Sequence, residues 1–291
     1  MRQLSVKNPF GAPVYHEETV SSTMETARIL AGQNEGHGTV ITADFQEGGR
    51  GRLKRPWSTE RGKNLLFTIL LRYGALSSIP EALTLRTGLA VSQAIEDFAP
   101  ALSGSVQVKW PNDVMIYPQG EFSVSIPRKA VGILTETDGK NVFIGVGVNV
   151  AQEEFPEEYR SKAISIIQAV PVSGAPGMPG KSDKSGKPGS FDKDARFDLL
   201  EKILFRLYNE IEKGEEASVA TPLRAAGSWQ ERLIRRLYKK GELVTFAEGA
   251  ADSNQITEGI LSGIGPGGEL LIIPRGENKE RAFVNGELRV Y

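Results

Sequence analysis

The chain has 291 residues, of which 40% are hydrophobic, and its formal net charge is −1 at pH 7. A chain of this length can bury a full core and is expected to form two domains, while its near-neutral charge argues against a protein-wide binder of nucleic acid or anionic membranes. The absence of cysteine excludes disulfides, thiolate catalysis and zinc–cysteine sites, and with only His16 and His37 we expect no catalytic triad or multi-histidine metal site.

The N-terminal stretch MRQLSVKNPFGAPVY lacks the apolar core of a signal peptide, and no run of the chain approaches transmembrane length. We therefore expect a soluble, cytoplasmic protein. A short strand is predicted at residues 15–18. The helix after it is predicted to begin with a capping box, for which Ser22 and Glu25 have the required spacing, and to end at Gly32.

A cationic, glycine-rich loop at residues 44–62, here called the cover loop, connects two predicted buried strands at 39–43 and 65–71. Glycine lets a backbone approach a ligand closely, and arginine offers a fork of donors for carboxylate and phosphate oxygens. With the aromatic face of Trp57, this composition predicts a mobile cover over a small anionic ligand. A solvated surface loop and a loop that binds a nucleic-acid backbone are the alternatives.

The next part of the chain predicts a helix at 80–98 with a broad apolar face, followed by short β-rich segments. These segments are residues 106–110, 114–117, 129–136 and 142–150. The last two are expected to form a hairpin around Asp138 and Gly139. Strands in a meander with segregated helices favour an α+β fold over a strictly alternating parallel one.

Two features of these strands point to chemistry. The segment KWPND, residues 109–113, ends a strand with a polar turn and presents the Asp113 carboxylate beside a lysine and a tryptophan; an ordinary turn is the alternative. Lys129 opens the otherwise apolar strand KAVGIL, where an ammonium is costly to bury without an anionic partner.

Glycines alternate along the strand that follows. Gly145 and Gly147, with Asn149 next in the alternation, leave one face of the segment FIGVGVN bare. Because glycine weakens a strand, room for a flat ligand against the sheet is a better explanation than chance.

The C-terminal half is predicted to contain an exposed or disordered excursion at 170–190, rich in Pro, Gly, Ser and Lys, and helices at 196–213 and 223–237. From Gly241 onward, five short strands separated by Gly and Asn turns predict a small β-barrel. We therefore expect two domains, residues 1–238 with a flexible insertion at 170–190, and residues 239–291.

Four segments in this order, GRGRLKRPWSTERGKNLLFTI, KWPNDV, RKAVGILTE and FIGVGVNV, with Ser22 and Thr23 upstream, resemble the signature of biotin protein ligases over roughly residues 14–150. The resemblance implies an α+β catalytic domain of the class II synthetase-like type, with a mixed sheet and helices on one side, plus a C-terminal SH3-like barrel. It also implies that ATP and biotin react to biotinyl-5′-AMP and pyrophosphate. The biotinyl group then passes to a lysine of the biotin carboxyl carrier domain of acetyl-CoA carboxylase or another biotin-dependent carboxylase.

The same resemblance implies roles for individual residues. Those expected to bind biotin are Ser22, Thr23, Gln46, Gly49, Arg50, Arg52, Lys129, Gly132, Gly145 and Gly147. Those expected to bind ATP or the adenylate are Arg50, Gly51, Arg52, Arg55, Trp57, Asn112, Lys129 and Asn149, with Trp57 near the adenine. Lys129, Arg52 and Asp113 are the expected catalytic residues. Asn112, Asp113 and Asn149 fall on the nucleotide and magnesium side, which places Mg²⁺ near Asp113.

Two departures from the family pattern concern detail. Met24 stands where the family often has asparagine, and residues 122–127 lengthen the segment before Lys129. Because the catalytic pattern begins close to Met1, we expect a form without a DNA-binding helix-turn-helix. A lipoate-type ligase of the same superfamily and a non-catalytic nucleic-acid-binding module are the rival functions, and the residues leave monomer and homodimer open.

Overall fold

The computed structural model describes residues 1–119, 126–170, 195–213, 227–249 and 255–289. The excursion predicted at 170–190, apart from Val170, lies outside these residues, as does most of the lengthened segment at 122–127. Within the described ranges, no helix combines the length and the apolar character needed to cross a membrane.

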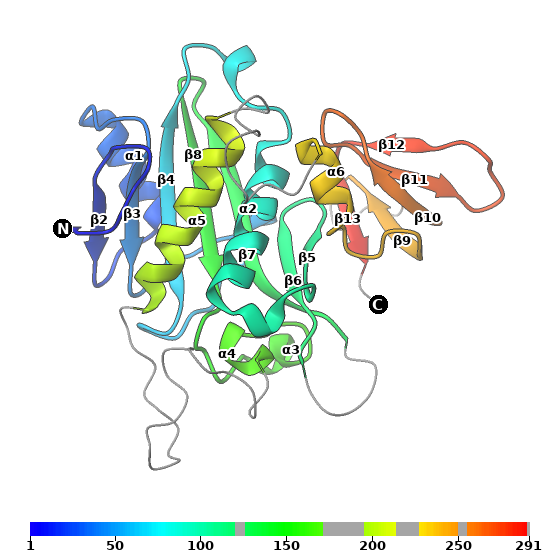
Figure 1. Ribbon diagram of the computed structural model, residues 1–291, viewed down its shortest axis with the longest axis horizontal. Coiled ribbons are helices and arrows are strands. Elements are labelled where there is room, and N and C mark those ends of the chain that lie inside the picture. Colours follow the sequence, from blue (N-terminus) through cyan, green and yellow to red (C-terminus); the bar gives the residue numbers. More distant parts are fainter. Residues whose placement is uncertain (120–125, 171–194, 214–226, 250–254, 290–291) are drawn as a thin grey trace.

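A mixed sheet of eight described strands forms the larger part of the molecule (Figure 1). Its strands are β1 (Arg2–Leu4), β2 (Val14–Glu17), β3 (Thr39–Ala43), β4 (Leu65–Arg72), β5 (Val106–Lys109), β6 (Asp113–Ile116), β7 (Arg128–Thr137) and β8 (Asn141–Val148). They lie in the order β1-β2-β3-β4-β8-β7-β6-β5. β2 and β3 run parallel and the other neighbouring pairs are antiparallel, which confirms the predicted mixed sheet and α+β class.

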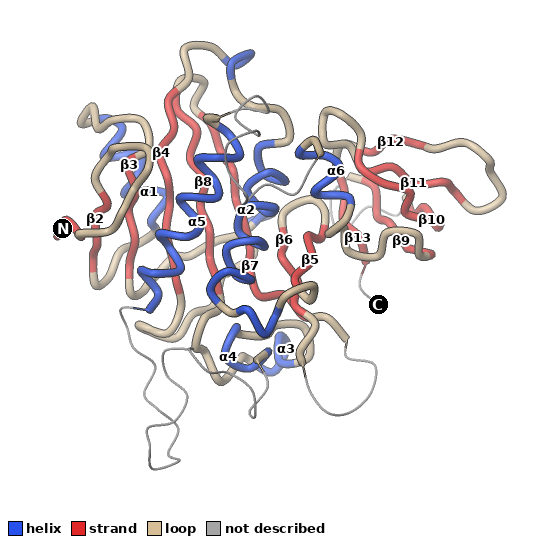
Figure 2. The backbone as a smooth tube through the Cα atoms, in the orientation of Figure 1, coloured by secondary structure: helices blue, strands red, loops and turns tan. Residues whose placement is uncertain are grey.

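Helices cover both faces of this sheet. The long helices α2 (Leu83–Phe98) and α5 (Ala195–Ile211) lie side by side on one face (Figure 2), where Phe67 of β4 belongs to their apolar cluster. α1 (Thr23–Gly32) packs against the opposite face with Leu70 of the same strand. The expectation of helices on one side is therefore wrong for α1, because residues of opposite parity along a strand point to opposite faces and both sets here are apolar.

α1 begins where predicted, but with a simpler cap. The Ser22 hydroxyl accepts a hydrogen bond from the Met24 N–H, and Glu25 instead accepts one from the Ser21 hydroxyl. The helix ends at Gly32, as expected. The predicted capping box is thus replaced by a single side-chain cap, which still satisfies one N–H of the first turn.

α2 begins later than predicted, and the β7–β8 hairpin forms as predicted. Ala82, with φ of 51°, is the left-handed residue that precedes α2, so the helix starts at Leu83 and not at Pro80. At the hairpin, Gly139 has φ of 95° and Asp138 donates its N–H to the Asn141 carbonyl. The shorter helices are α3 (Glu157–Arg160), α4 (Ile166–Ala169) and α6 (Trp229–Ile234). α6 is shorter than the helix predicted at 223–237, because the described residues 227–228 and 235–237 lie outside it.

Five described strands form a second, antiparallel sheet near the C-terminus, in the number predicted. They are β9 (Leu243–Glu248), β10 (Ile256–Ile264), β11 (Leu270–Pro274), β12 (Arg281–Phe283) and β13 (Gly286–Arg289), in the order β12-β11-β10-β9-β13. This sheet shares one apolar cluster with α2 and with Trp110, whose indole N–H donates to the Gly268 carbonyl at 3.0 Å. The C-terminal sheet therefore lies directly against the KWPND turn.

Candidate functional site

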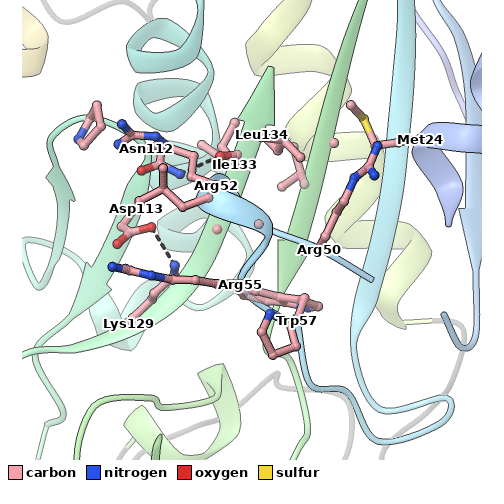
Figure 3. A pocket seen from close by; sticks show the side chains of 18 of the residues that line it. Met24, Arg50, Arg52, Arg55, Trp57, Asn112, Asp113, Lys129, Ile133 and Leu134 are labelled. Atoms are coloured by element: carbon pink, nitrogen blue, oxygen red, sulfur yellow. Dashed lines mark hydrogen bonds and ion pairs between the residues drawn. The ribbon is translucent and has the colours of Figure 1, made fainter. Parts of the chain in front are cut away.

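A cavity of about 120 Å³, here called the first cavity, lies between the cover loop and the α1 face of β7 and β8 (Figure 3). All predicted site residues except Gly49 and Asn149 line it. Figure 3 shows Met24 and Arg50 at one end, and Asp113 and Lys129 at the other. The first cavity is smaller than the roughly 300–1,000 Å³ of typical small-molecule sites, so a ligand of that size requires a side chain to move.

The bare glycine surface predicted from the sequence is present, but the indole of Trp57 covers it. Gly132 and Gly147 pair across β7 and β8. A Cβ added to Gly147 would lie 2.6 Å from Trp57 Cε2, and one added to Gly132 would lie 2.7 Å from Trp57 Cζ3. The Trp57 indole N–H is buried and has no hydrogen-bond partner among the described residues. Trp57 thus occupies the space expected for a flat ligand, and it is the side chain that must move.

Gly147→Ala is expected to weaken binding of the biotin that the resemblance implies roughly tenfold, because a methyl group on the floor keeps a flat ring off the sheet. Isothermal titration with biotin measures the change. Gly32→Ala is the matched control, since an added Cβ there meets no atom within 4 Å. Unchanged biotin affinity in Gly147→Ala would contradict the placement of the ring on this surface.

At the Met24 end of the first cavity, a network of hydrogen bonds joins α1, Gln46 and β4. Gln46 Oε1 accepts from the Thr23 N–H at 2.8 Å and from its hydroxyl at 3.0 Å, and the Thr68 hydroxyl donates to Thr23 Oγ1 at 2.9 Å. Beside it, a Cβ added to Gly145 would lie 2.9 Å from Met24 Sδ. This end therefore offers fixed polar groups next to a thioether where the resembled family often has an amide.

Three charged groups meet at the other end. Asp113 Oδ1 lies 2.7 Å from Lys129 Nζ, and Asp113 Oδ2 lies 3.8 Å from Lys109 Nζ. Burial alone would raise the pKa of Asp113, but the Lys129 and Lys109 ammonium groups outweigh it and hold that pKa below its usual value. Burial lowers the pKa of Lys109, and the neighbouring Asp113 carboxylate only partly offsets this effect.

Lys109 is the site residue that the sequence interpretation missed. Its side chain is 7% exposed, whereas that of Lys129, expected to be the buried ammonium, is 35% exposed. The signal was present in KWPND, where an ammonium stands four residues before a carboxylate. Only the β5–β6 register, which pairs Lys109 with Asp113, turns that spacing into a contact.

The arginines of the cover loop reach protein groups from two directions. Arg55 donates two hydrogen bonds of 3.0 Å to the Glu287 carboxylate, and Arg52 Nη2 lies 3.5 Å from Asn285 Oδ1. Arg50 lines the first cavity, and its Nη2 lies 3.9 Å from Glu136 Oε2. Burial tends to raise the pKa of Glu287, but its hydrogen bonds with Arg55 lower it below the usual value. The C-terminal sheet thus holds one edge of the cover loop, a contact that no motif indicated.

A second cavity of about 670 Å³ adjoins the first, and Lys109, Asp113 and Lys129 line both. Asn149 lines the second cavity with a buried Oδ1 that has no hydrogen-bond partner in the described part of the chain. Its volume falls in the range of small-molecule sites. Asn112, expected on the same side, lines the first cavity instead, and its amide donates to the Ile133 carbonyl at 2.7 Å.

Gly49 lies behind the first cavity. Its carbonyl accepts from the Trp57 N–H at 2.9 Å, and an added Cβ would lie 3.0 Å from Gln46 Nε2. Because any side chain would crowd this glutamine, Gly49 acts on the site through the position of Gln46 and Trp57.

The donors around Asp113 do not fit a magnesium ion held by the protein. Among the described residues, no three His, Asp or Glu side chains come together to bind a metal. The Asp113 carboxylate is already flanked by two ammonium groups. Mg²⁺ needs near-octahedral oxygen ligands, usually including carboxylates. The expected magnesium position near Asp113 therefore has no support from these side chains.

Residues 17–149 match the model of the Biotin/lipoate A/B protein ligase family. The chain is 36% identical over 166 residues to the bifunctional ligase/repressor BirA of Bacillus spizizenii, a match covering 55% of this chain and 47% of that protein. It is 31% identical over 134 residues to the biotin–[acetyl-CoA-carboxylase] ligase of Mycobacterium tuberculosis, covering 45% of each. The chain thus spans about half the length of the curated relatives it matches.

Among solved structures, the chain is similar to biotin protein ligase from Aquifex aeolicus in complex with biotin and ATP, with a TM-score of 0.66 and 26% identity. That similarity covers 95% of this chain and 97% of the Aquifex chain. It therefore includes the C-terminal sheet as well as the large one, in agreement with the predicted SH3-like second unit.

Proposed function

Since residues 17–149 match the model of the Biotin/lipoate A/B protein ligase family, we propose that the chain is an ATP-dependent biotin protein ligase. The observation that carries this proposal is the junction of two cavities at Lys129, Lys109 and Asp113, the first floored by glycines and the second large enough for a nucleotide. Biotin would enter the first cavity and ATP the second, so that a carboxylate and an α-phosphate meet beside the Lys129 ammonium group.

The first half-reaction joins two anions. A biotin carboxylate oxygen attacks the α-phosphorus, the bond from that phosphorus to the bridging oxygen breaks, and pyrophosphate leaves with the electron pair. Lys129 and Arg52 would stabilise the charge on the pentacoordinate phosphate, which is the largest contribution that a preorganised site can make. Ordering of the cover loop would then exclude water from the mixed anhydride that results.

The second half-reaction needs a neutral amine. The acceptor lysine gives a proton to the Asp113 carboxylate, its nitrogen attacks the biotinyl carbonyl carbon, and the carbon–oxygen bond to phosphate breaks as AMP leaves. The second amine proton is lost to solvent as the amide forms. We propose a biotin carboxyl carrier domain of acetyl-CoA carboxylase or another biotin-dependent carboxylase as the acceptor. The relatives named above are ligases, and one is named for that carboxylase.

The organisation of the chain around this site is also a proposal. We propose a catalytic domain at residues 1–238 and an SH3-like domain at 239–291, the second holding the cover loop through Glu287. A cytoplasmic location, the absence of DNA binding, a possible homodimer and a requirement for Mg²⁺ stay predictions.

The test is to incubate the protein with ATP, magnesium chloride and either biotin or lipoate, and to measure pyrophosphate and the acyl-adenylate. We expect both products with biotin and neither with lipoate. Products with lipoate but not with biotin would favour the lipoate-type ligase. If no pyrophosphate were released in the presence of either acid, the proposal would be refuted. Addition of a biotin carboxyl carrier domain should then consume the adenylate and biotinylate its lysine.

A further inference from the structure

One charged group at the junction of the two cavities has no part in the reaction as proposed above. The ammonium of Lys109 is almost fully buried, faces both cavities and lies 3.8 Å from Asp113 Oδ2, too far for a hydrogen bond. A buried ammonium without such a bond is costly, and burial indeed lowers the pKa of Lys109. We therefore expect the Lys109 ammonium to have a role in the reaction at the junction of the two cavities.

The backbone fixes Lys109 and Asp113 against each other. They are opposite residues of the β5–β6 hairpin, joined only by the tight turn at residues 110–112. The strand that carries Lys109 is held from its other side, because the Val108 N–H donates to the Arg236 carbonyl at 2.8 Å and the Tyr238 N–H donates to the Val108 carbonyl at 2.9 Å. The backbones of Lys109 and Asp113 are therefore held in a fixed register.

Backbone hydrogen bonds also hold Lys129, but its side chain is less enclosed. It projects from β7, its side chain is five times as exposed as that of Lys109, and its ammonium also lies 5.5 Å from the centre of the Trp57 ring. The same Trp57 must leave the glycine floor when a ligand enters. Lys129 can therefore turn from Asp113 to a ligand anion, while Lys109 stays where the hairpin places it.

We propose that Lys109 is a positioning residue for the second half-reaction, which keeps Asp113 ionised and oriented once Lys129 has turned to the adenylate. This inference rests on the proposed function. In the free protein the positive charges of Lys129, Lys109 and, more weakly, Arg52 act on Asp113, and the proposed binding of the adenylate turns Lys129 and Arg52 to the phosphate. Without Lys109, the carboxylate would then stand in a desolvated site with no positive charge held beside it by the hairpin, which favours its protonated form. A protonated Asp113 cannot take a proton from the acceptor lysine.

The experiment separates the two half-reactions in Lys109→Met, which keeps the length of the side chain and removes its charge. Adenylate formation is followed by pyrophosphate release from biotin and ATP. Transfer is followed in a single turnover, by mixing preformed enzyme–adenylate complex with a biotin carboxyl carrier domain. We expect adenylation within about threefold of the wild-type rate and transfer slowed roughly tenfold, a part of the 10²–10⁴ that a positioned base supplies.

A double-mutant cycle distinguishes this role from a general disturbance of the fold. If Lys109 acts through Asp113, Lys109→Met slows transfer in the wild-type background and has no further effect in Asp113→Asn. The matched control is Lys63→Met, since Lys63 also lies near a carboxylate, at 3.9 Å, but outside both cavities. Lys109→Arg, which restores the charge, should recover part of the transfer rate.

Several outcomes overturn the inference. Equal slowing of both half-reactions in Lys109→Met at unchanged melting temperature would make Lys109 a direct ligand contact. Unchanged transfer would leave it without a role in the reaction. Should Lys109→Met fail to fold, Lys109→Gln is carried through the same cycle, and additive effects with Asp113→Asn overturn the inference. The proposed function itself is refuted if the wild-type protein makes no adenylate. The inference alone is refuted if the wild-type protein makes adenylate and Lys109→Met transfers it at the normal rate.

Discussion

Lys129→Ala should lower the rate of adenylate formation by about 10²–10³-fold, the loss seen when one preorganised donor is removed from a site of developing charge. Lys129 is the more exposed of the two ammonium groups and the one free to turn toward the α-phosphate. In the free protein its closest charged neighbour is Asp113, which Lys109 also approaches. Pyrophosphate release at saturating ATP and biotin measures the loss, and a pre-steady-state burst separates it from slow product release.

The stability of Lys129→Ala should change little. An ion pair whose lysine is a third exposed contributes at most about 1 kcal/mol after solvent screening, so the urea midpoint is expected to shift only slightly. Lys63→Ala provides the control, because the Lys63 side chain is 36% exposed and pairs with Glu153 away from the cavities. If the fold and the activity of Lys129→Ala fell together, Lys129 would be structural and the proposed mechanism would lose its main cation.

Arg52→Gly is expected to release the adenylate about a hundredfold faster than the wild-type protein. Hydrogen bonds to charged groups contribute about 1.5–3 kcal/mol each, and the larger value corresponds to that factor. Arg52 lines the first cavity, and its contact with Asn285, at 3.5 Å, is long enough to be exchanged for a ligand oxygen. Free biotinyl-AMP would then label lysines of bystander proteins such as serum albumin, which streptavidin blotting detects.

The control for Arg52→Gly is Lys54→Gly. Lys54 lies in the same short turn of the cover loop, is exposed and does not line either cavity. Lys54→Gly adds a glycine to the same turn without loss of a cavity-facing guanidinium, at a residue whose φ of 58° already suits glycine. Fast release from both variants would attribute retention to the stiffness of the loop, and tight retention in Arg52→Gly would contradict its role as a cover over the adenylate.

Elements with strong local signals were predictable from the sequence. β3 has the predicted bounds because five apolar or β-branched residues stand between glycine and the polar cover loop, and the β7–β8 hairpin follows from Asp138 and Gly139. The face on which α1 packs was not predictable. The period of its apolar residues marks a stripe on the helix but says nothing about which side of a sheet, itself apolar on both, that stripe will meet.

The candidate site likewise contains features that the sequence predicts and features that it does not. Motifs indicated which residues gather around the first cavity, and strand pairing brings them together there, with Asp113 opposite Gly132 and Gly132 opposite Gly147. The partners of those residues could not be read from the motifs. Arg55 and Glu287 are 232 positions apart, and Lys109 meets Asp113 only through strand register. The indole of Trp57 on the glycine floor reflects competition between a protein ring and a ligand for one surface, which a linear pattern does not encode.

Trp110 has a consequence for how the C-terminal fifty residues can vary. Its indole is part of the apolar cluster beneath the C-terminal sheet and is tied to the Gly268 carbonyl, while its backbone belongs to the turn that aims Asp113. A substitution that repacks the buried side of the C-terminal sheet would therefore change the orientation of the Asp113 carboxylate. The reaction thus limits which substitutions the C-terminal sheet tolerates, although that sheet contributes few atoms to the site.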